Sequence, residues 1–429
     1  MPSTTYKTAT KLLDATTFCT HIMGRHVKVH SSGAVKLDWP GVRLDFDNPI
    51  SQTLSIQVRM IGNGSSFGYR LTAISEGVDQ RSIYNNNDDE GEDRFFLATP
   101  PGKKIANYPL LTLDGVSAVS KLDPKKSYKL SLWKRDDPFH GGAQILGLAV
   151  DRTCTCAPAE TFLTSNKQSR LIEFVGDSNT VGFGITSPKT GFVQHLFCGL
   201  LCTKYLKKPV NLIKTTDTTK AWGHRVATEL DADYHIIAWS GIGATHSVIV
   251  EGNTNMTQAY SRVLASDPST DVAPGSDSLG ASPDAVVVYI GQNDMVMTSN
   301  PAKFKNGFSQ LLQKIRSYRP LPTPIVVIIP SRDTKLAAQR SKSSNRQIAG
   351  ALNQIWTQVV KEQVEREAHE TDVDNIGPCT HILEANHDPP LSGTRSSDDF
   401  GMIFHWNVSS NDKWAKWVVP RLKNILNWK

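Results

Sequence analysis

The sequence predicts an all-β sandwich followed by an α/β domain with a mostly parallel sheet, and three observations support this. Residues 24 to about 153 contain short runs in which apolar and polar residues alternate between turn residues, as in a β-sandwich or jelly roll. From residue 169 onward, short apolar runs alternate with helix-like stretches, which indicates a sheet with helices on both faces. The length of 429 residues allows two or three domains, each with its own core.

The β-sandwich is expected to span residues 24–153, after an N-terminal extension at residues 1–23. Its strand-like runs are at residues 27–29, 42–46, 54–58, 69–71 and 128–132. Residues 84–93 are acidic and polar. Their carboxylates could bind calcium, but the spacing fits no EF-hand, and we favour a solvated loop. Residues 154–168 are expected to form a linker to the second domain.

The α/β domain is expected to span residues 169–429. Its strands are predicted at residues 171–175, 234–239, 285–290, 324–329 and 379–384, and its apolar helical stripes at residues 222–230, 304–315 and 348–359. Residues 265–283 are expected to form a surface loop, and residues 385–404 a lid-like loop. Ser409 and Asp412 form a capping-box pattern before the last helix, which Pro420 should kink or split.

Composition excludes several classes of partner. The net charge of +6 is spread along the chain without a dense basic block, so we expect no nucleic-acid partner. No apolar run approaches the ~20 residues of a membrane span, so we expect no membrane partner. The polar N-terminus does not resemble a signal peptide, so either the protein stays inside the cell or its leader is absent from this chain. The six cysteines include no Cys-x-x-Cys pair with a matching partner, which argues against a zinc site, and no metal or organic cofactor is expected.

The run Val-Gly-Asp-Ser-Asn at residues 175–179 is the first candidate for a catalytic motif. Gly176 allows a sharp turn at the end of the preceding strand. Ser178 would then lie where a helix begins, and backbone N–H groups at a helix start point toward negative charge. An ordinary strand-to-helix turn, capped by Asp177 or Ser178, is the alternative interpretation.

Three later stretches favour the catalytic interpretation. Gly241 follows the apolar run 234–238, Asn293 and Asp294 follow the run 285–290, and His405 lies near the C-terminus. In this order, Gly-Asp-Ser, a later Gly, Gly-x-Asn-Asp and a C-terminal His resemble the four sequence blocks of the SGNH (GDSL-type) hydrolases. This resemblance implies a flavodoxin-like α/β/α domain.

The architecture narrows the resemblance. A β-sandwich that contains Asp-Trp-Pro-Gly at residues 38–41, followed by these four blocks, is similar to carbohydrate esterase family 2 from about residue 24 to the C-terminus. That family implies a jelly roll beside the hydrolase domain and removal of O-acetyl groups from plant-type polysaccharides and oligosaccharides, such as xylan or glucomannan. It also implies an extracellular location. A monomer is expected. The sequence leaves the polysaccharide and the acetylated position open.

An acetyl ester needs a nucleophile, a base and donors for the oxyanion. We predict Ser178 as the nucleophile and His405 as the general base. The backbone N–H groups of Ser178 and Gly241, with the side-chain amide of Asn293, are the predicted oxyanion donors. Two neighbouring acids are expected to support the site: Asp177 by anchoring the nucleophile turn, and Asp294 by capping the following helix and orienting Asn293.

The chain departs from most SGNH hydrolases at the acid that orients the histidine. Met402 occupies the usual position of this acid, three residues before His405. Some members of carbohydrate esterase family 2 resemble this chain in lacking the acid. We therefore predict a Ser-His dyad, with Asp399 as a weak alternative acid. A dyad stabilises the imidazolium less, so a slower enzyme is expected.

Two tryptophans are candidates for sugar stacking. Trp39 precedes a Pro-Gly turn, and Trp406 follows His405. For Trp39 a core or turn-packing role is the favoured alternative, and for Trp406 packing under the last helix is equally favoured. The competing functions are a carbohydrate-binding protein whose hydrolase half has decayed, and an SGNH esterase acting on lipid or thioester substrates. The four intact motif residues argue against the first, and the β-sandwich argues against the second.

Overall fold

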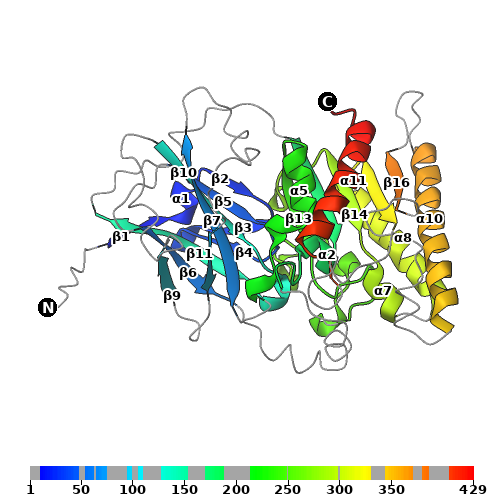
Figure 1. Ribbon diagram of the computed structural model, residues 1–429, viewed down its shortest axis with the longest axis horizontal. Helices are drawn as coiled ribbons and strands as arrows, with labels where there is room; N and C mark the ends of the chain where they lie inside the picture. The colour runs from blue at the N-terminus through cyan, green and yellow to red at the C-terminus, as the bar shows by residue number, and fades with distance from the viewer. Residues whose placement is uncertain are drawn as a thin grey trace.

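The computed structural model has two antiparallel sheets in its N-terminal half and one parallel sheet in its C-terminal half (Figure 1). The residues that it describes are 10–47, 54–61, 64–74, 94–98, 105–109, 127–152, 170–187, 213–248, 250–297, 300–329, 344–370, 379–385 and 405–429. This arrangement confirms the predicted fold class.

The β-sandwich consists of two sheets whose strands all pair antiparallel. One sheet has the order β3 (His26–Val29), β4 (Ala34–Leu37), β11 (Ala143–Asp151), β6 (Leu54–Met60) and β9 (Ile105–Pro109). The other has the order β2 (His21–Met23), β5 (Arg43–Asp47), β10 (Ser127–Lys134), β7 (Ser65–Ile74) and β8 (Arg94–Ala98). Burial alternates along β6 as the sequence pattern predicts, because one strand face meets the core and the other does not.

Residues 1–23 were expected to form an N-terminal extension, and for residues 10–23, which the structure describes, this expectation is wrong. β1 (Thr10–Asp14) pairs with β11, and β2 pairs with β5. The short helix α1 (Ala15–Phe18) connects them and begins at Asp14, whose carboxylate accepts the Thr17 N–H. Residues 10–23 therefore belong to the sandwich.

The C-terminal sheet has the strand order β13 (Ala232–Ala238), β12 (Arg170–Gly176), β14 (Ala285–Tyr289), β15 (Ile325–Ile329) and β16 (Thr380–Glu384). All its pairs are parallel. This is the flavodoxin-like order, in which the chain reverses direction across the sheet between the first and third strands. Here that switch point lies between β12 and β14, and ligands bind beyond the carboxyl ends of the strands at such a point.

Helices cover both faces of the parallel sheet. The longer ones are α5 (Trp222–Glu229), α8 (Pro301–Tyr318), α10 (Ser344–Glu370) and α11 (Val408–Leu426). The shorter ones are α2 (Ser178–Val181), α6 (Met256–Ala259) and α7 (Gln292–Met297). This half also has 3-10 turns at Thr218–Lys220, Glu251–Asn253, Pro268–Thr270 and Asp277–Leu279, whereas those at His30–Ser32 and Pro138–His140 belong to the sandwich. Along β14, Val286 and Val288 pack with α8 and α10, whereas Val287 and Tyr289 pack with α5 and α11.

The last helix differs from its prediction at two points. It begins after Asn407, whose side chain accepts the Ser410 N–H, rather than at the predicted capping box. It continues through Pro420 without a break. Pro420 and Lys416 lie on the exposed face, where water can bind the carbonyl group that loses its helical partner.

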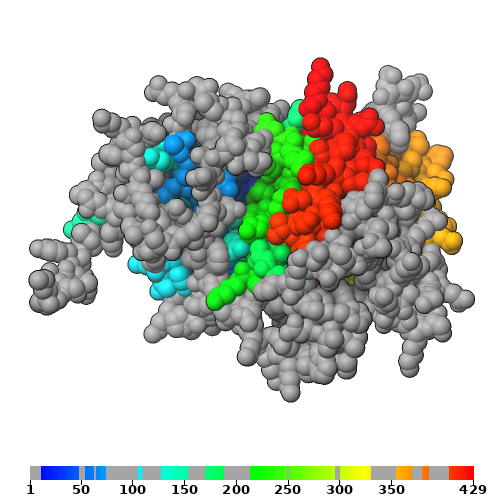
Figure 2. All heavy atoms as spheres, in the orientation of Figure 1, coloured from blue at the N-terminus to red at the C-terminus, as the bar shows by residue number. Residues whose placement is uncertain are grey.

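The two halves pack directly against each other. One hydrophobic cluster contains sandwich residues such as Trp39 together with Tyr260 and residues of α8 and α10. In the space-filling view, α5 and α11 lie side by side and α5 lies between α11 and the sandwich (Figure 2). In the part of the chain that the structure describes, no helix is long and apolar enough to cross a membrane.

Candidate active site

The nucleophile turn follows β12 at the switch point of the sheet. Asp177 caps α2 by accepting the Asn179 N–H at 3.1 Å, as predicted, and Ser178 is the first residue of this helix. A Cβ atom at Gly176 would lie 2.0 Å from the Thr180 hydroxyl oxygen and 3.0 Å from the Tyr289 carbonyl oxygen. Only glycine therefore fits at the end of β12, where the strand lies beside Tyr289 of β14.

His405 meets Ser178 although 227 residues separate them in the sequence. The His405 Nε2 atom lies 2.7 Å from the Ser178 Oγ atom, a hydrogen-bonding distance. The ring of Phe183 lies against the imidazole, with centroids 4.8 Å apart. The structure thus brings together the two residues predicted to act as nucleophile and base.

Gly241 lies in the loop after β13 with a left-handed backbone, φ 77°. Its carbonyl oxygen accepts the Val248 N–H at 2.8 Å. Among the described residues, neither the Gly241 N–H nor the Ser178 N–H donates a hydrogen bond. Donors that serve an oxyanion have to be free of such partners, so both groups meet this requirement.

Asn293 connects the first and second motifs. Its Nδ2 atom donates to the Ile242 carbonyl oxygen at 2.8 Å and lies 3.4 Å from the Asp177 Oδ2 atom. The side chain is partly exposed, and it extends from the start of α7 at the end of β14. The amide thus lies between the nucleophile turn and the Gly241 loop. Both of its hydrogens have protein acceptors within reach, so it has to release one of them to donate to an oxyanion.

Asp294 has a different role from the predicted helix cap. Its carboxylate accepts the backbone N–H groups of Ala244, Thr245 and His246 at 2.7, 2.8 and 2.9 Å, and also the Thr245 hydroxyl. A Cβ atom at Gly243 would lie 2.5 Å from this carboxylate. Asp294 therefore holds the loop that follows Gly241, and α7 itself begins before it, at Gln292.

The acids of the site have raised pKa values. Burial raises the pKa of Asp177 to about 7, and the nearby Asp294 carboxylate adds to this, while the Asn179 N–H opposes it. Burial also raises the pKa of Asp294, although the loop donors on its carboxylate oppose that shift. A raised pKa of this kind is common at functional sites because burial and like charges are combined there.

Neither tryptophan is placed to stack on a sugar in the way considered above. Trp39 is 0% exposed, and its Nε1 donates to the Arg262 carbonyl oxygen at 3.3 Å. The stacking prediction for Trp39 is therefore wrong, because no ring face is accessible. Trp406 is 8% exposed and stacks on Tyr289 with centroids 5.6 Å apart, which favours its packing role.

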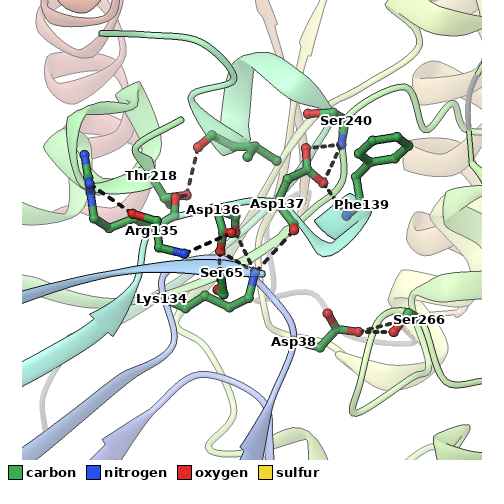
Figure 3. A network of polar contacts seen from close by, with 12 residues as sticks. Asp38, Ser65, Lys134, Arg135, Asp136, Asp137, Phe139, Thr218, Ser240 and Ser266 are labelled. Carbon is green, nitrogen blue, oxygen red and sulfur yellow. Dashed lines mark hydrogen bonds and ion pairs between the residues drawn. The ribbon is translucent and has the colours of Figure 1, made fainter. Parts of the chain in front are cut away.

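Asp137, from the β-sandwich, contacts the loop that follows β13, and the sequence analysis did not select it. The Asp137 Oδ2 atom accepts the Ser240 N–H at 3.0 Å (Figure 3). The only local signal was an Asp-Pro pair, which indicates a turn and nothing about the distant partner. Asp399, Met402 and the acidic loop at residues 84–93 lie outside the described residues, so the acid partner of His405 stays a prediction.

Comparison with known proteins identifies similar families and folds. The sequence profile of the GDSL-like lipase/acylhydrolase family matches residues 174–422. The chain is 31% identical over 184 residues to an acetylxylan esterase / glucomannan deacetylase of Cellvibrio japonicus, which covers 42% of this chain and 43% of that protein. It is also 25% identical over 234 residues to the cellulase/esterase CelE of Acetivibrio thermocellus. This aligned segment covers 54% of this chain and 25% of that protein. The matched segments thus span less than half of either relative.

Two solved structures share the fold over nearly their whole length. A family two carbohydrate esterase from Clostridium thermocellum, in complex with cellohexaose, has a TM-score of 0.64 at 18% identity and covers 95% of this chain and 99% of that one. A family two carbohydrate esterase from Cellvibrio japonicus has a TM-score of 0.65 at 16% identity and covers 98% of this chain and 99% of that one. Both comparisons support the order of a sandwich followed by a parallel sheet.

Proposed function

The chain belongs to the GDSL-like lipase/acylhydrolase family, and we propose that it is a serine esterase that removes O-acetyl groups from plant-type carbohydrate such as xylan or glucomannan. The observation that carries this proposal is the 2.7 Å contact between His405 Nε2 and Ser178 Oγ. A decayed site would have no reason to keep this pair together with the Ser178 and Gly241 N–H groups, which donate to no described residue. The pair supports a chemistry that needs no cofactor.

The reaction proceeds through an acetyl-enzyme. The Ser178 hydroxyl attacks the acetyl carbonyl carbon while His405 takes its proton. The carbonyl oxygen becomes an oxyanion that the Ser178 and Gly241 N–H groups and the Asn293 amide stabilise, each donor contributing about 3 kcal/mol. The C–O bond to the sugar then breaks, and His405 returns the proton to the leaving sugar hydroxyl. Water, activated by the same histidine, releases acetate and restores Ser178.

The carbohydrate substrate is proposed on similarity. The relative from Cellvibrio japonicus is named an acetylxylan esterase and glucomannan deacetylase, and the structure from Clostridium thermocellum holds cellohexaose. The presence of a β-sandwich packed on the hydrolase half, as in those structures, supports the same substrate class here. Esters of lipids or thiols are the competing substrates.

The test is acetate release from acetylated xylan, acetylated glucomannan and 4-nitrophenyl acetate. Ser178→Ala should lower kcat/KM at least about 10⁴-fold on every substrate, because no other group replaces the nucleophile. Ser317→Ala, at an exposed position on α8, is the matched control and should keep full activity. Folding of each variant is checked by circular dichroism.

Three results would contradict the proposal in different ways. A folded wild-type protein that hydrolyses none of the esters would favour a carbohydrate-binding protein, and sugar titrations would then follow. Equal activity in wild type and Ser178→Ala would refute the assigned nucleophile. Hydrolysis of the aryl acetate without any release from the polysaccharides would refute the substrate class alone.

A further inference from the structure

The end of strand β10 brings a group of buried polar residues from the sandwich against the catalytic half (Figure 3). Lys134 is completely buried, with its Nζ atom 2.8 Å from the Asp136 Oδ1 atom. The Asp136 carboxylate also accepts the Ser65 hydroxyl at 2.6 Å and the Ser66 N–H at 3.1 Å. These contacts fix the backbone of the segment, so the residues that follow it have a defined position.

This segment contacts the nucleophile turn through the neighbouring loop. Arg135 pairs with Asp217, with its Nη2 atom 2.7 Å from the Oδ2 atom. The Arg135 carbonyl oxygen accepts the Thr218 N–H at 2.9 Å. The Thr218 hydroxyl lies between this carbonyl oxygen and that of Val181, at 2.9 and 2.8 Å. Val181 ends helix α2, so the sandwich supports the helix that begins with Ser178.

The same segment contacts the oxyanion loop directly. Asp137 is 0% exposed. Its Oδ2 atom accepts the Ser240 N–H at 3.0 Å, and its Oδ1 atom accepts the Phe139 N–H at 2.9 Å. The hydrogen bond from the Phe139 N–H holds the carboxylate in place. The hydrogen bond from the Ser240 N–H holds the peptide between Trp239 and Ser240, next to the peptide that carries the Gly241 N–H. No other described group accepts the Ser240 N–H.

We propose that Asp137 is a positioning residue of the esterase, which acts from the sandwich by fixing the Ser240–Gly241 backbone so that the Gly241 N–H faces the oxyanion. The inference rests on the proposed function. A glycine populates positive and negative φ about equally, so Gly241 at φ 77° needs an external hold to stay in one conformation. Oxyanion donors stabilise the transition state only when they are oriented beforehand. The sandwich therefore contributes to the chemistry itself, in addition to any contact with sugar.

The test compares Asp137→Ala with Asp38→Ala on 4-nitrophenyl acetate, a substrate without a sugar. Asp38 is a matched control because it is also a buried sandwich carboxylate that accepts a backbone N–H of the catalytic half, that of Ser266 at 2.7 Å. Ser266 is exposed, and its N–H and hydroxyl both donate to Asp38 and not to a motif residue. Asp137→Ala should lower kcat about 10- to 100-fold with KM within about twofold, whereas Asp38→Ala should keep kcat within about twofold of wild type.

Asp137→Asn is the second variant, for the case that Asp137→Ala does not fold. An amide oxygen at the Oδ1 position can still accept the Phe139 N–H and the longer, 3.3 Å bond from the Ser240 N–H, but the 3.0 Å bond to Oδ2 is lost. A smaller loss of kcat, about 3- to 10-fold, is therefore expected. A kcat in the folded Asp137 variants equal to that of the Asp38 variants would overturn this inference while leaving the proposed function intact. A wild-type protein that does not hydrolyse the ester would overturn both.

Discussion

Strand β12 carries two buried carboxylates in contrasting surroundings, Glu173 within the strand and Asp177 just after its end. The Glu173 carboxylate lies 3.2 Å from Arg25 Nη2 and 2.7 Å from Arg319 Nη2. Although burial acts to raise its pKa, the two arginines hold the pKa of Glu173 well below its ordinary value. Asp177 is bound by a backbone N–H instead, and burial raises its pKa to about 7.

The different surroundings of the two carboxylates distinguish the buried centre of the sheet, at Glu173, from the edge of the sheet that carries the candidate site, at Asp177. Arg25 comes from the sandwich and Arg319 follows α8, so the Glu173 cluster joins the two halves by charge. Among the described ion pairs none includes Asp177, Asp294 or Asp137. Their hydrogen-bond donors are backbone N–H groups, together with the Asn293 amide at Asp177 and the Thr245 hydroxyl at Asp294. This suits the proposed mechanism, in which His405 becomes positively charged when it takes the Ser178 proton, because a fixed cation nearby would oppose that charge. Loops at the edge are thus oriented by donors that carry no full charge.

Removing the Glu173 carboxylate should have the largest effect on stability. Glu173→Ala leaves Arg25 and Arg319 buried without their counter-ion. Removing one partner of a buried ion pair typically costs about 3–5 kcal/mol. We expect the free energy of unfolding, measured with urea, to fall by about this amount. The folded fraction should keep the wild-type kcat on 4-nitrophenyl acetate, because the described partners of the Glu173 carboxylate include none of the motif residues. A loss below about 1 kcal/mol would show that the cluster does not join the halves.

Asp177→Asn should change the pH dependence of stability. Because the pKa of Asp177 rises from 3.8 to about 7 on folding, the folded protein holds a proton between these values that the unfolded chain releases. Raising the pH through this interval therefore lowers the stability of the wild type relative to the variant, by at most about 1.4 kcal/mol per pH unit. Urea unfolding of both proteins at pH 5, 6, 7 and 8 measures this difference.

The contribution of Glu173 to stability should depend on pH in the opposite direction to that of Asp177, and only below the pH range of this experiment. The pKa of Glu173 is lowered on folding, so its stabilising contribution is fully present above its unfolded pKa and is lost only as the pH falls toward the folded value. The stability difference between wild type and Glu173→Ala should therefore stay constant from pH 5 to 8. A constant difference for Asp177→Asn as well would refute the contrast between the two carboxylates.

The features that could be predicted from the sequence are those that local residue patterns encode, chiefly the strands and helices of the catalytic half. The parallel strands and the helices α5, α8 and α10 lie where the apolar runs placed them, because period and burial are linked within each element. The resemblance to the SGNH blocks also predicted that Ser178 and His405 would meet, although His405 lies just before α11 and not at the end of a strand. Strand β1 was missed because its partner β11 is far away in the sequence.

The roles of individual acids could not be predicted for the same reason. Glu173 was visible only as one polar residue in a buried strand, and its partner Arg25 lies 148 residues away. Asp294 was interpreted as a helix cap, a local role, whereas its carboxylate accepts N–H groups 48 to 50 residues away. Asp137 contacts Ser240 across 103 residues. Such contacts depend on how distant segments pack, within the catalytic half for Asp294 and between the halves for Glu173 and Asp137, and no local pattern encodes this.

The smallest expected effect tests whether burial, rather than the ion pair itself, distinguishes the Glu173 cluster. Lys305 and Glu362 join α8 to α10 with Nζ and Oε1 only 2.6 Å apart, but their side chains are 32% and 37% exposed. Water screens this pair in both the folded and unfolded states, so Glu362→Ala should lower the free energy of unfolding by less than about 1 kcal/mol, and by still less in 1 M salt. Urea unfolding at low and high salt measures both quantities. A loss as large as that of Glu173→Ala would mean that distance, and not burial, sets the strength of ion pairs in this protein.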